Sequence, residues 1–157
     1  MLPRDLIATA QRLALANPKK PRQSDLKRAV SSTYYALFHM IAKAAADSLV
    51  GVSKAARANR AWRQVYRALN HGPARMACTK REISRFPQEI QDFASMFVVM
   101  QAKRHDADYD PFSRVFKQEV LRDIENVRQV LDDFGSVALN DKKAFAVWVL
   151  FQQRPDR

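Results

Sequence analysis

Glycine and cysteine are scarce in this sequence of 157 residues. The three glycines, Gly51, Gly72 and Gly135, are too scattered to build a glycine-rich phosphate-binding loop. Cys78 is the only cysteine, so the chain forms no disulfide within itself and has no cysteine partner for a zinc site. Because disulfides are typical of oxidising compartments, we expect a cytoplasmic protein.

Other common signals are also missing. No stretch approaches the roughly 18 apolar residues of a membrane-spanning helix, and charges interrupt segment 2–15, so we expect neither a membrane protein nor a secretory signal. The β-branched residues form no alternating run, which predicts that strands are absent. The histidines His39, His71 and His105 lack the spacing of a zinc-binding pair, and no Gly-x-Ser-x-Gly elbow occurs. We therefore expect no metal and no other cofactor.

Basic residues are abundant. The 27 Lys and Arg stand against 16 Asp and Glu, which gives a formal net charge of +11. The excess is concentrated in segment 54–85, where nine Lys and Arg are accompanied by Glu82 as the single acidic residue. Such a surface attracts polyanions, so we expect RNA or another polyanion as a partner. The alternative is a solvated basic face without a ligand.

Apolar residues recur at steps of three and four, which is typical of helices with one buried face. We expect helices over segments 3–16, 24–50, 54–70, 87–103, 110–135 and 141–152. Short links between them predict a single all-α domain over residues 1–157, an antiparallel bundle of about five to six helices. The last segment is rich in aromatic residues, which we expect to close the core rather than to form a dimer surface.

Caps and helix breakers set the expected helix ends. Ser24 is a favourable N-cap, and Asp110 followed by Pro111 combines a cap with proline at the first helical position. Segment 71–73, with the sequence His-Gly-Pro, predicts the end of the third helix. Segment 74–86 has no clear pattern.

Arginines mark one side of the helix expected over segment 54–70. Four of them recur at steps of three and four, namely Arg57, Arg60, Arg63 and Arg67. We interpret this stripe as a candidate surface for binding a nucleic-acid backbone. A DNA-binding protein that inserts this helix into the major groove is an alternative, although no helix-turn-helix spacing precedes the stripe.

Two patches concentrate polar side chains. The first is segment 29–39, in which tyrosines, serines and a histidine share one predicted helix. Arg28, Tyr35 and His39 lie on one face of that helix because they are seven and four residues apart. We interpret these three side chains as part of a polar network, or alternatively as residues that satisfy hydrogen bonds at the edge of the core.

The second patch is segment 104–110, with the sequence Arg-His-Asp-Ala-Asp-Tyr-Asp, at the expected junction of two long helices. Asp108 or Asp110 is suited to cap the helix that follows. A cap does not explain the whole cluster, so this junction is the candidate site. Its members are Arg104, His105 and Tyr109 with the carboxylates Asp106, Asp108 and Asp110.

Together the two patches resemble the HEPN family, small helical-bundle domains of toxin–antitoxin, defence and nucleotidyltransferase-associated proteins. The resemblance rests on residues 28–39, Arg-Ala-Val-Ser-Ser-Thr-Tyr-Tyr-Ala-Leu-Phe-His, and on residues 104–110, and it spans most of the chain. It implies a HEPN-like bundle that acts as a homodimer. It also implies a cognate antitoxin or a nucleotidyltransferase as a partner.

Many HEPN members are metal-independent ribonucleases with an arginine, an adjacent polar residue and a histidine four to six residues after the arginine. The resemblance makes Arg104, His105 and Tyr109 the candidate catalytic residues, with Arg104 as the phosphate clamp. Tyr109 stands where the histidine is expected, and a phenol that titrates near roughly pH 10 is a poor base. The junction is similar to a branch of the family that reads Arg-x-x-Ala-Asp-Tyr, so phosphate binding is a stronger expectation than cleavage.

A non-catalytic HEPN-like module is the alternative. Such a module binds a partner protein or a nucleotide, and its junction serves as a structural latch. In that case Arg104 pairs with Asp108 or Asp110, and Tyr109 packs between helices. An Arg104 that is sealed inside one chain would favour the latch.

Overall fold

The computed structural model describes residues 2–154, and this part of the chain is helical without a strand. Its elements are α1 (Pro3–Leu15), α2 (Gln23–Leu49), α3 (Asn59–Arg67), α4 (His71–Thr79), the 3-10 helix η1 (Arg81–Arg85), α5 (Gln88–Tyr109), α6 (Lys117–Gly135) and α7 (Leu139–Leu150). The predicted all-α class is confirmed. The described residues form seven α-helices rather than the expected five or six, because a helix also forms at the start of the unpatterned segment. No helix in this part of the chain is long and apolar enough to cross a membrane.

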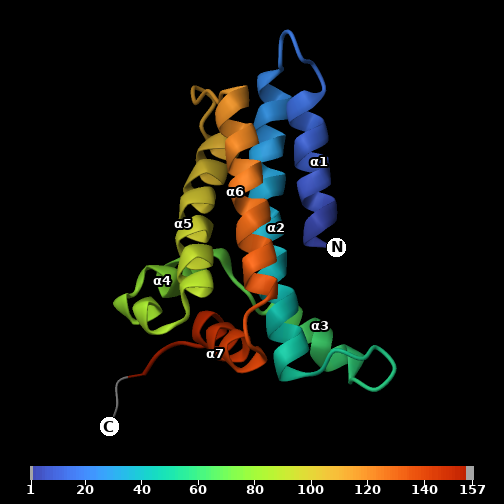
Figure 1. Cartoon of the computed structure of the whole chain (residues 1–157), viewed down its shortest axis with the longest axis vertical. Helices are drawn as coiled ribbons and strands as arrows, with labels where there is room; N and C mark the ends of the chain where they lie inside the picture. Colours follow the sequence, from blue (N-terminus) through green and yellow to red (C-terminus); the bar gives the residue numbers. More distant parts are fainter. Residues whose placement is uncertain (1, 155–157) are drawn as a thin grey trace.

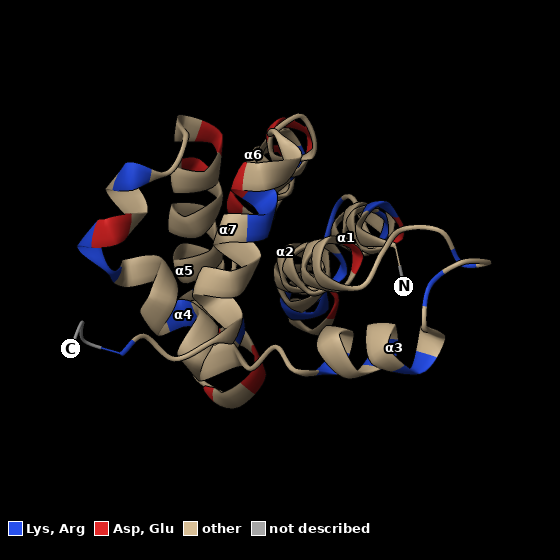
Figure 2. Cartoon of the chain, turned by 90° about the horizontal axis from the view of Figure 1, so that it is seen from below, with Lys and Arg blue, Asp and Glu red and all other residues tan. Residues whose placement is uncertain are grey.

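Four long helices stand side by side as an up-down-up-down bundle (Figure 1). α1 pairs with α2 and α5 pairs with α6, while α2 also contacts α5, α6 and α7. The links 16–22 and 110–116 lie at the same end of the bundle, which we call the linker end. The opposite end is covered by α4 and α7, and α3 stands apart from the other short helices (Figure 2).

Large apolar side chains fill the interior. The fully buried ones with rings are Tyr34, Phe93, Phe97, Phe134 and Phe145. The rings of Phe93, Phe134 and Phe145 pack against one another with centroids 4.6 to 6.1 Å apart. Contacts of this kind stabilise a core beyond the area that they bury. The apolar stripes predicted for the long helices therefore do face the core.

α7 closes this core, as expected from its aromatic residues. Phe145 and Val149 are buried, and Trp148 donates its indole N–H to the carbonyl of Ala77 on α4 at 3.0 Å. Phe151, which directly follows the helix, remains 58% exposed. The contacts of this segment with the core therefore end before Phe151, its last aromatic residue.

The third helix is shorter than expected. It begins at Asn59, because residues 53–57 form a turn in which the Ser53 carbonyl accepts the N–H of Arg57 at 2.9 Å. Gly51 starts this change of direction with a φ of 139°, which side chains disfavour. Segment 71–73 does not end a helix but begins α4, where Pro73 sits in the first turn and its missing N–H costs little.

α5 continues through the segment that the sequence placed between two helices. It ends at Tyr109 rather than Lys103, so residues 104–109 form its last turns, and α6 begins at Lys117 rather than Asp110. Asp110 instead opens a turn, in which its carbonyl accepts the N–H of Ser113 at 3.3 Å and its Oδ1 accepts the N–H of Phe112 at 2.9 Å. Aspartate followed by proline is typical of the first two positions of such a turn.

Candidate functional site

Arg104 is buried in the seam between α2 and α5, with 9% of its surface exposed. Its guanidinium carbon lies 5.1 Å from the ring centroid of Tyr34 and 5.8 Å from that of Tyr35. Both distances permit cation–π attraction, which is strongest where water is excluded. α2 therefore supplies two aromatic rings that stabilise the charge of a residue from α5.

Asp108 completes the surroundings of Arg104. Its Oδ2 accepts a charge-assisted hydrogen bond from Arg104 Nη1 at 3.4 Å. Its Oδ1 accepts the hydroxyl hydrogen of Ser31 on α2. One carboxylate thus neutralises the arginine and connects the last turns of α5 to α2. We call this set, Ser31, Tyr34, Tyr35, Arg104 and Asp108, the Arg104 cluster.

His71, at the start of α4, is a member of this region that the sequence did not reveal. Its Nδ1 shares a hydrogen bond of 2.6 Å with the Tyr34 hydroxyl, and its ring stacks on Phe38 with centroids 4.2 Å apart. Burial, and secondarily the charge of Arg104, lower the pKa of His71 below its ordinary value of 6.5. The imidazole is therefore neutral at pH 7, and it lies beside the cluster despite its distance in sequence.

Two polar atoms in this region have no hydrogen-bond partner among the described residues. They are Arg104 Nε and Gln101 Oε1, and both residues are 9% exposed. The other end of the Gln101 amide donates to the carbonyl of His71 at 3.0 Å. Buried polar atoms are usually paired, so the α2–α4–α5 seam is an unusual part of the interior.

His105 and Tyr109 are exposed on the outer side of α5. Their rings lie 5.0 Å apart, and the Tyr109 centroid lies 6.0 Å from the guanidinium carbon of Arg104. Tyr109 thus reaches the edge of the Arg104 cluster, whereas His105 contacts only Tyr109 among these residues. The structure does not bring the three candidate catalytic side chains together around one point.

The predicted carboxylates have three different roles. Asp108 binds Arg104, as described above. Asp110 is exposed and holds the turn after α5, and its carbonyl accepts a hydrogen bond from Lys27 Nζ at 3.2 Å. Asp106 is exposed, and its backbone carbonyl accepts the hydroxyl hydrogen of Ser113 at 3.0 Å.

The polar network predicted on α2 is present in part. The rings of Tyr35 and His39 lie 6.2 Å apart, and His39 Nδ1 forms a hydrogen bond with the hydroxyl of Tyr66 on α3. Burial lowers the pKa of His39 as well. Arg28 is exposed at the far end of this face and has no described hydrogen bond to either partner.

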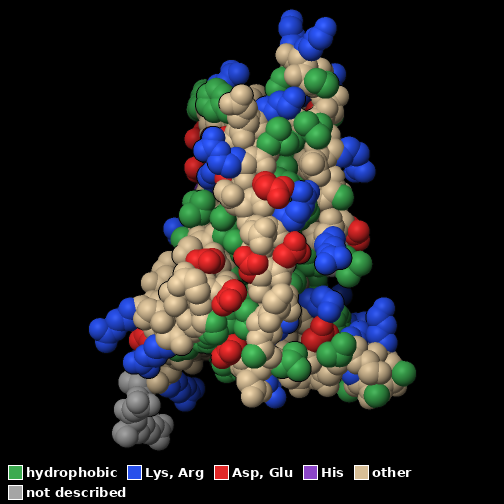
Figure 3. All heavy atoms as spheres, viewed as in Figure 1, with side chains coloured by type: hydrophobic (Ala, Val, Ile, Leu, Met, Phe, Trp, Pro, Cys, Tyr) green, Lys and Arg blue, Asp and Glu red, His purple; other side chains and the backbone are tan. Residues whose placement is uncertain are grey.

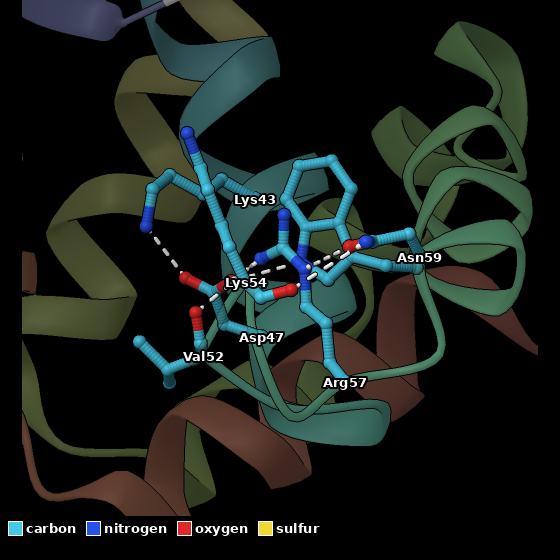
Figure 4. Close-up of polar contacts among 7 residues, drawn as sticks. Lys43, Asp47, Val52, Lys54, Arg57 and Asn59 are labelled. Atoms are coloured by element: carbon cyan, nitrogen blue, oxygen red, sulfur yellow. Dashed lines mark hydrogen bonds and ion pairs between the residues drawn. The ribbon is translucent and has the colours of Figure 1, made fainter.

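Arg57 lies outside the basic stripe of α3. It precedes the helix, and its guanidinium sits 4.1 Å from the ring centroid of Trp62 and 3.8 Å from Asp47 Oδ1 (Figure 4). Asp47 also accepts the indole N–H of Trp62 at 2.9 Å and pairs with Lys43. With its side chain 10% exposed, Arg57 anchors the turn before α3 to α2. Its charge is satisfied within the protein, contrary to its expected place on the stripe.

Two neighbouring hollows lie away from the Arg104 cluster. One of about 840 Å³ lies between α1, α2 and α6, and one of about 370 Å³ lies between α2, α6 and α7. Met40 and Lys43 line both of them. None of the candidate site residues lines either hollow.

Comparisons with known proteins find no match to this chain among family models, curated proteins or solved structures. Within residues 2–154 there is no group of three or more His, Cys, Asp or Glu side chains suited to hold a metal ion. The resemblance to HEPN domains and the expected homodimer stay predictions.

Proposed function

We propose that this chain is a HEPN-like RNA-binding domain whose binding surface is the basic side of α3. The observation that carries the proposal is the exposure of Arg60, Arg63 and Arg67 on a helix that projects from the bundle (Figure 2). α3 contains no Asp or Glu, and none of the described salt bridges involves these arginines. Free guanidinium groups bind phosphate without first giving up an ion pair.

The distribution of charge over the molecule supports this surface. Figure 3 shows most of the carboxylates on this face over the middle of the bundle, with some basic side chains beside them, and further basic side chains towards the two ends. An RNA strand is repelled by the acidic face and attracted by the ends. α3 belongs to the basic part.

In this proposal Arg104 is a structural residue. An RNA phosphate that reached Arg104 would have to displace Asp108 and expose a side chain that Tyr34 and Tyr35 now cover. Displacing Asp108, whose side chain is 31% exposed, is unfavourable because the buried charge of Arg104 then loses its compensation. The pairing of Arg104 with Asp108 supports the latch form of the alternative hypothesis, whereas Tyr109, which that form packs between helices, is 67% exposed. In this proposal α3 supplies the binding.

The test is RNA binding by a triple variant in which Arg60, Arg63 and Arg67 are replaced by glutamine. Fluorescence anisotropy of a labelled oligoribonucleotide measures the affinity. We expect binding to weaken by about tenfold or more, because even one hydrogen bond to a charged group contributes about 1.5 kcal/mol or more. The binding of the wild type should also fall steeply as salt is added.

A matched control removes the same charge elsewhere. Arg4 and Arg12 on α1 and Lys143 on α7 are exposed, and glutamine at all three positions lowers the net charge equally. The control should lose far less affinity than the α3 variant. Equal losses in the two triple variants would remove α3 as the binding surface, and a wild type that binds no RNA would remove the proposed function.

RNA cleavage is a second candidate function, and His71 is the residue that favours it. Its lowered pKa provides a neutral base beside Arg104. With its Nδ1 proton donated to the Tyr34 oxygen, Nε2 would accept the proton of an RNA 2′-hydroxyl. That oxygen would attack the adjacent phosphorus as the bond to the 5′-oxygen breaks. The leaving oxygen would take a proton from water, the proton held on Nε2 would neutralise the resulting hydroxide, and a 2′,3′-cyclic phosphate would remain.

Cleavage is tested by incubating a generic RNA with the wild type, His71→Gln and His105→Gln in the presence of EDTA. Denaturing gels then resolve the products. Products that form with the wild type and His105→Gln but not with His71→Gln would support cleavage by His71. Background levels from all three proteins would remove cleavage and leave the RNA-binding proposal intact.

A further inference from the structure

The linker end of the bundle is held together by hydrogen bonds that join each link to the first residue of the helix that follows the other link. The Gln23 amide donates to the carbonyl of Val115 at 2.9 Å and accepts the N–H of the same residue at 3.0 Å. Lys117 Nζ donates to the carbonyl of Pro18 at 3.4 Å. Segment 110–116 therefore follows a fixed course beside the start of α2.

This fixed segment turns aromatic rings outward. Phe112 is 91% exposed and Phe116 is 66% exposed, while Val115 between them packs on the core. Tyr109, one turn earlier, is 67% exposed. Single exposed apolar residues are common, but segment 109–116 exposes three aromatic rings close together in sequence, and concentrated apolar surface marks binding sites. We call Tyr109, Phe112 and Phe116 the aromatic cluster.

Basic side chains are also exposed at the linker end. The exposed ones on the two links are Lys19, Lys20, Arg22 and Arg114. None of them takes part in a described salt bridge. Arg114 lies between Phe112 and Phe116 in sequence, and the hydrogen bond from Lys117 to Pro18 brings the other link alongside. Figure 3 shows hydrophobic and basic side chains next to one another at this end of the molecule.

We propose that the linker end binds unpaired nucleotides of RNA, with bases stacked on the aromatic cluster and phosphates held by the neighbouring cations. Aromatic rings interleaved with basic residues suit single strands, because every base has a flat π-face and the backbone is anionic. In a duplex the bases are already stacked on one another, so no free base reaches the rings. This inference rests on the proposed RNA binding, and it adds a second surface that selects for single strands.

A membrane is the main competitor for an exposed patch of this composition. Binding at a lipid interface is typical of an amphipathic helix that presents one continuous apolar face. Here the rings belong to the end of α5, a turn and the residue before α6, and charged residues separate them. This small aromatic area fits a few bases better than a lipid surface.

The experiment compares the affinities of the full chain for an oligouridine, for an oligoadenosine and for an RNA duplex of the same length. Phe112→Ala and Phe116→Ala are each expected to weaken single-strand binding about fivefold or more, as stacking on one aromatic residue does. Duplex binding should stay within about twofold of the wild type, because α3 carries it. Phe112→Leu keeps an apolar side chain without a ring and should weaken binding almost as much as alanine.

Phe151→Ala is the matched control, because Phe151 is also exposed, at 58%, but lies beyond the end of α7. The affinity of the Phe151→Ala variant for single strands should equal that of the wild type. Wild-type affinity in Phe112→Ala and Phe116→Ala would overturn the aromatic site alone, whereas a wild type that binds no RNA would overturn the proposed function too. Binding to anionic phosphatidylserine vesicles that Phe112→Ala abolishes, with RNA binding unchanged, would replace this site by a lipid site.

Discussion

The guanidinium of Arg104 is stabilised by groups from two helices. Tyr34 and Tyr35 cover it from α2, and Asp108 binds it from the next turn of α5. With 9% of the residue exposed, water contributes little to solvating this charge. An exposed arginine near the end of a helix would gain only a small stabilisation from the helix dipole. The contacts with Tyr34, Tyr35 and Asp108 therefore make Arg104 a structural residue.

Replacing Arg104 by alanine is expected to lower the free energy of unfolding by about 2–3 kcal/mol, because the cation–π contacts and a charged hydrogen bond are lost. Arg104→Lys should recover less than half of this loss, since an ammonium group cannot lie flat on a ring and bind Asp108 as well. Urea unfolding followed by circular dichroism measures the change.

Arg63→Ala is the matched control for that experiment. Arg63 is exposed on α3 and makes no described salt bridge, so its removal should change stability by no more than about 0.5 kcal/mol. Similar stabilities for Arg104→Ala and Arg63→Ala would contradict the structural role assigned to Arg104.

The sequence predicted several members of the Arg104 cluster but not how they meet. Helical spacing gives neighbours within one helix, so the pairing of Arg104 with Asp108 was among the expected alternatives. The contacts of Asp108 with Ser31, and of His71 with Tyr34, depend on how each helix is rotated towards its neighbour. No local pattern encodes that rotation, which is why His71 was missed.

Single helices show which local signals are ambiguous. Asp110 followed by Pro111 fits both the start of a helix and the first positions of a β-turn, and here the turn forms. Similarly, glycine and proline in segment 71–73 suggested a helix end, although proline is also tolerated in a first turn. Both ambiguities moved helix boundaries, and the one at Asp110 placed the candidate site in a junction instead of on α5.

The apolar periodicity was more dependable for the long helices. α1 and α2 lie where their stripes predicted, and α5 begins where predicted although it extends to Tyr109, because each must bury one continuous face against the others. α3 buries none of its side chains fully, and the turn before it could not be foreseen from its apolar residues. The contacts of Arg57 with Asp47 and Trp62 could not be foreseen from helical spacing either, because they depend on how the turn before α3 packs on α2.

The molecule as a whole separates its functions in space. Apolar periodicity along the chain sets the bundle, and the bundle places a compact polar cluster in the α2–α4–α5 seam. The two surfaces proposed for a polyanion are α3 and the linker end, which lie at opposite ends of α2 (Figure 1). The net charge of +11 predicted a polyanion partner, but only the fold shows which cations are free of internal partners.

Two partly buried histidines make the stability of the whole bundle depend on pH. His39 joins α2 to α3 through Tyr66, and His71 joins α4 to α2 through Tyr34. Burial lowers the pKa of both imidazoles below the ordinary 6.5. Between the folded and the unfolded pKa the unfolded chain binds more protons, so acid favours unfolding.

The free energy of unfolding is therefore expected to have its highest value above about pH 7. It should fall as the pH drops through about 6.5 towards the lowered pKa values of the two histidines in the folded protein. Urea unfolding at several values between about pH 7.5 and about pH 5.5 measures this dependence. The double variant His39→Gln/His71→Gln should flatten it, whereas His105→Gln, at an exposed position, should keep the wild-type slope. A double variant that follows the wild-type curve would show that these two histidines are not the groups whose protonation destabilises the bundle.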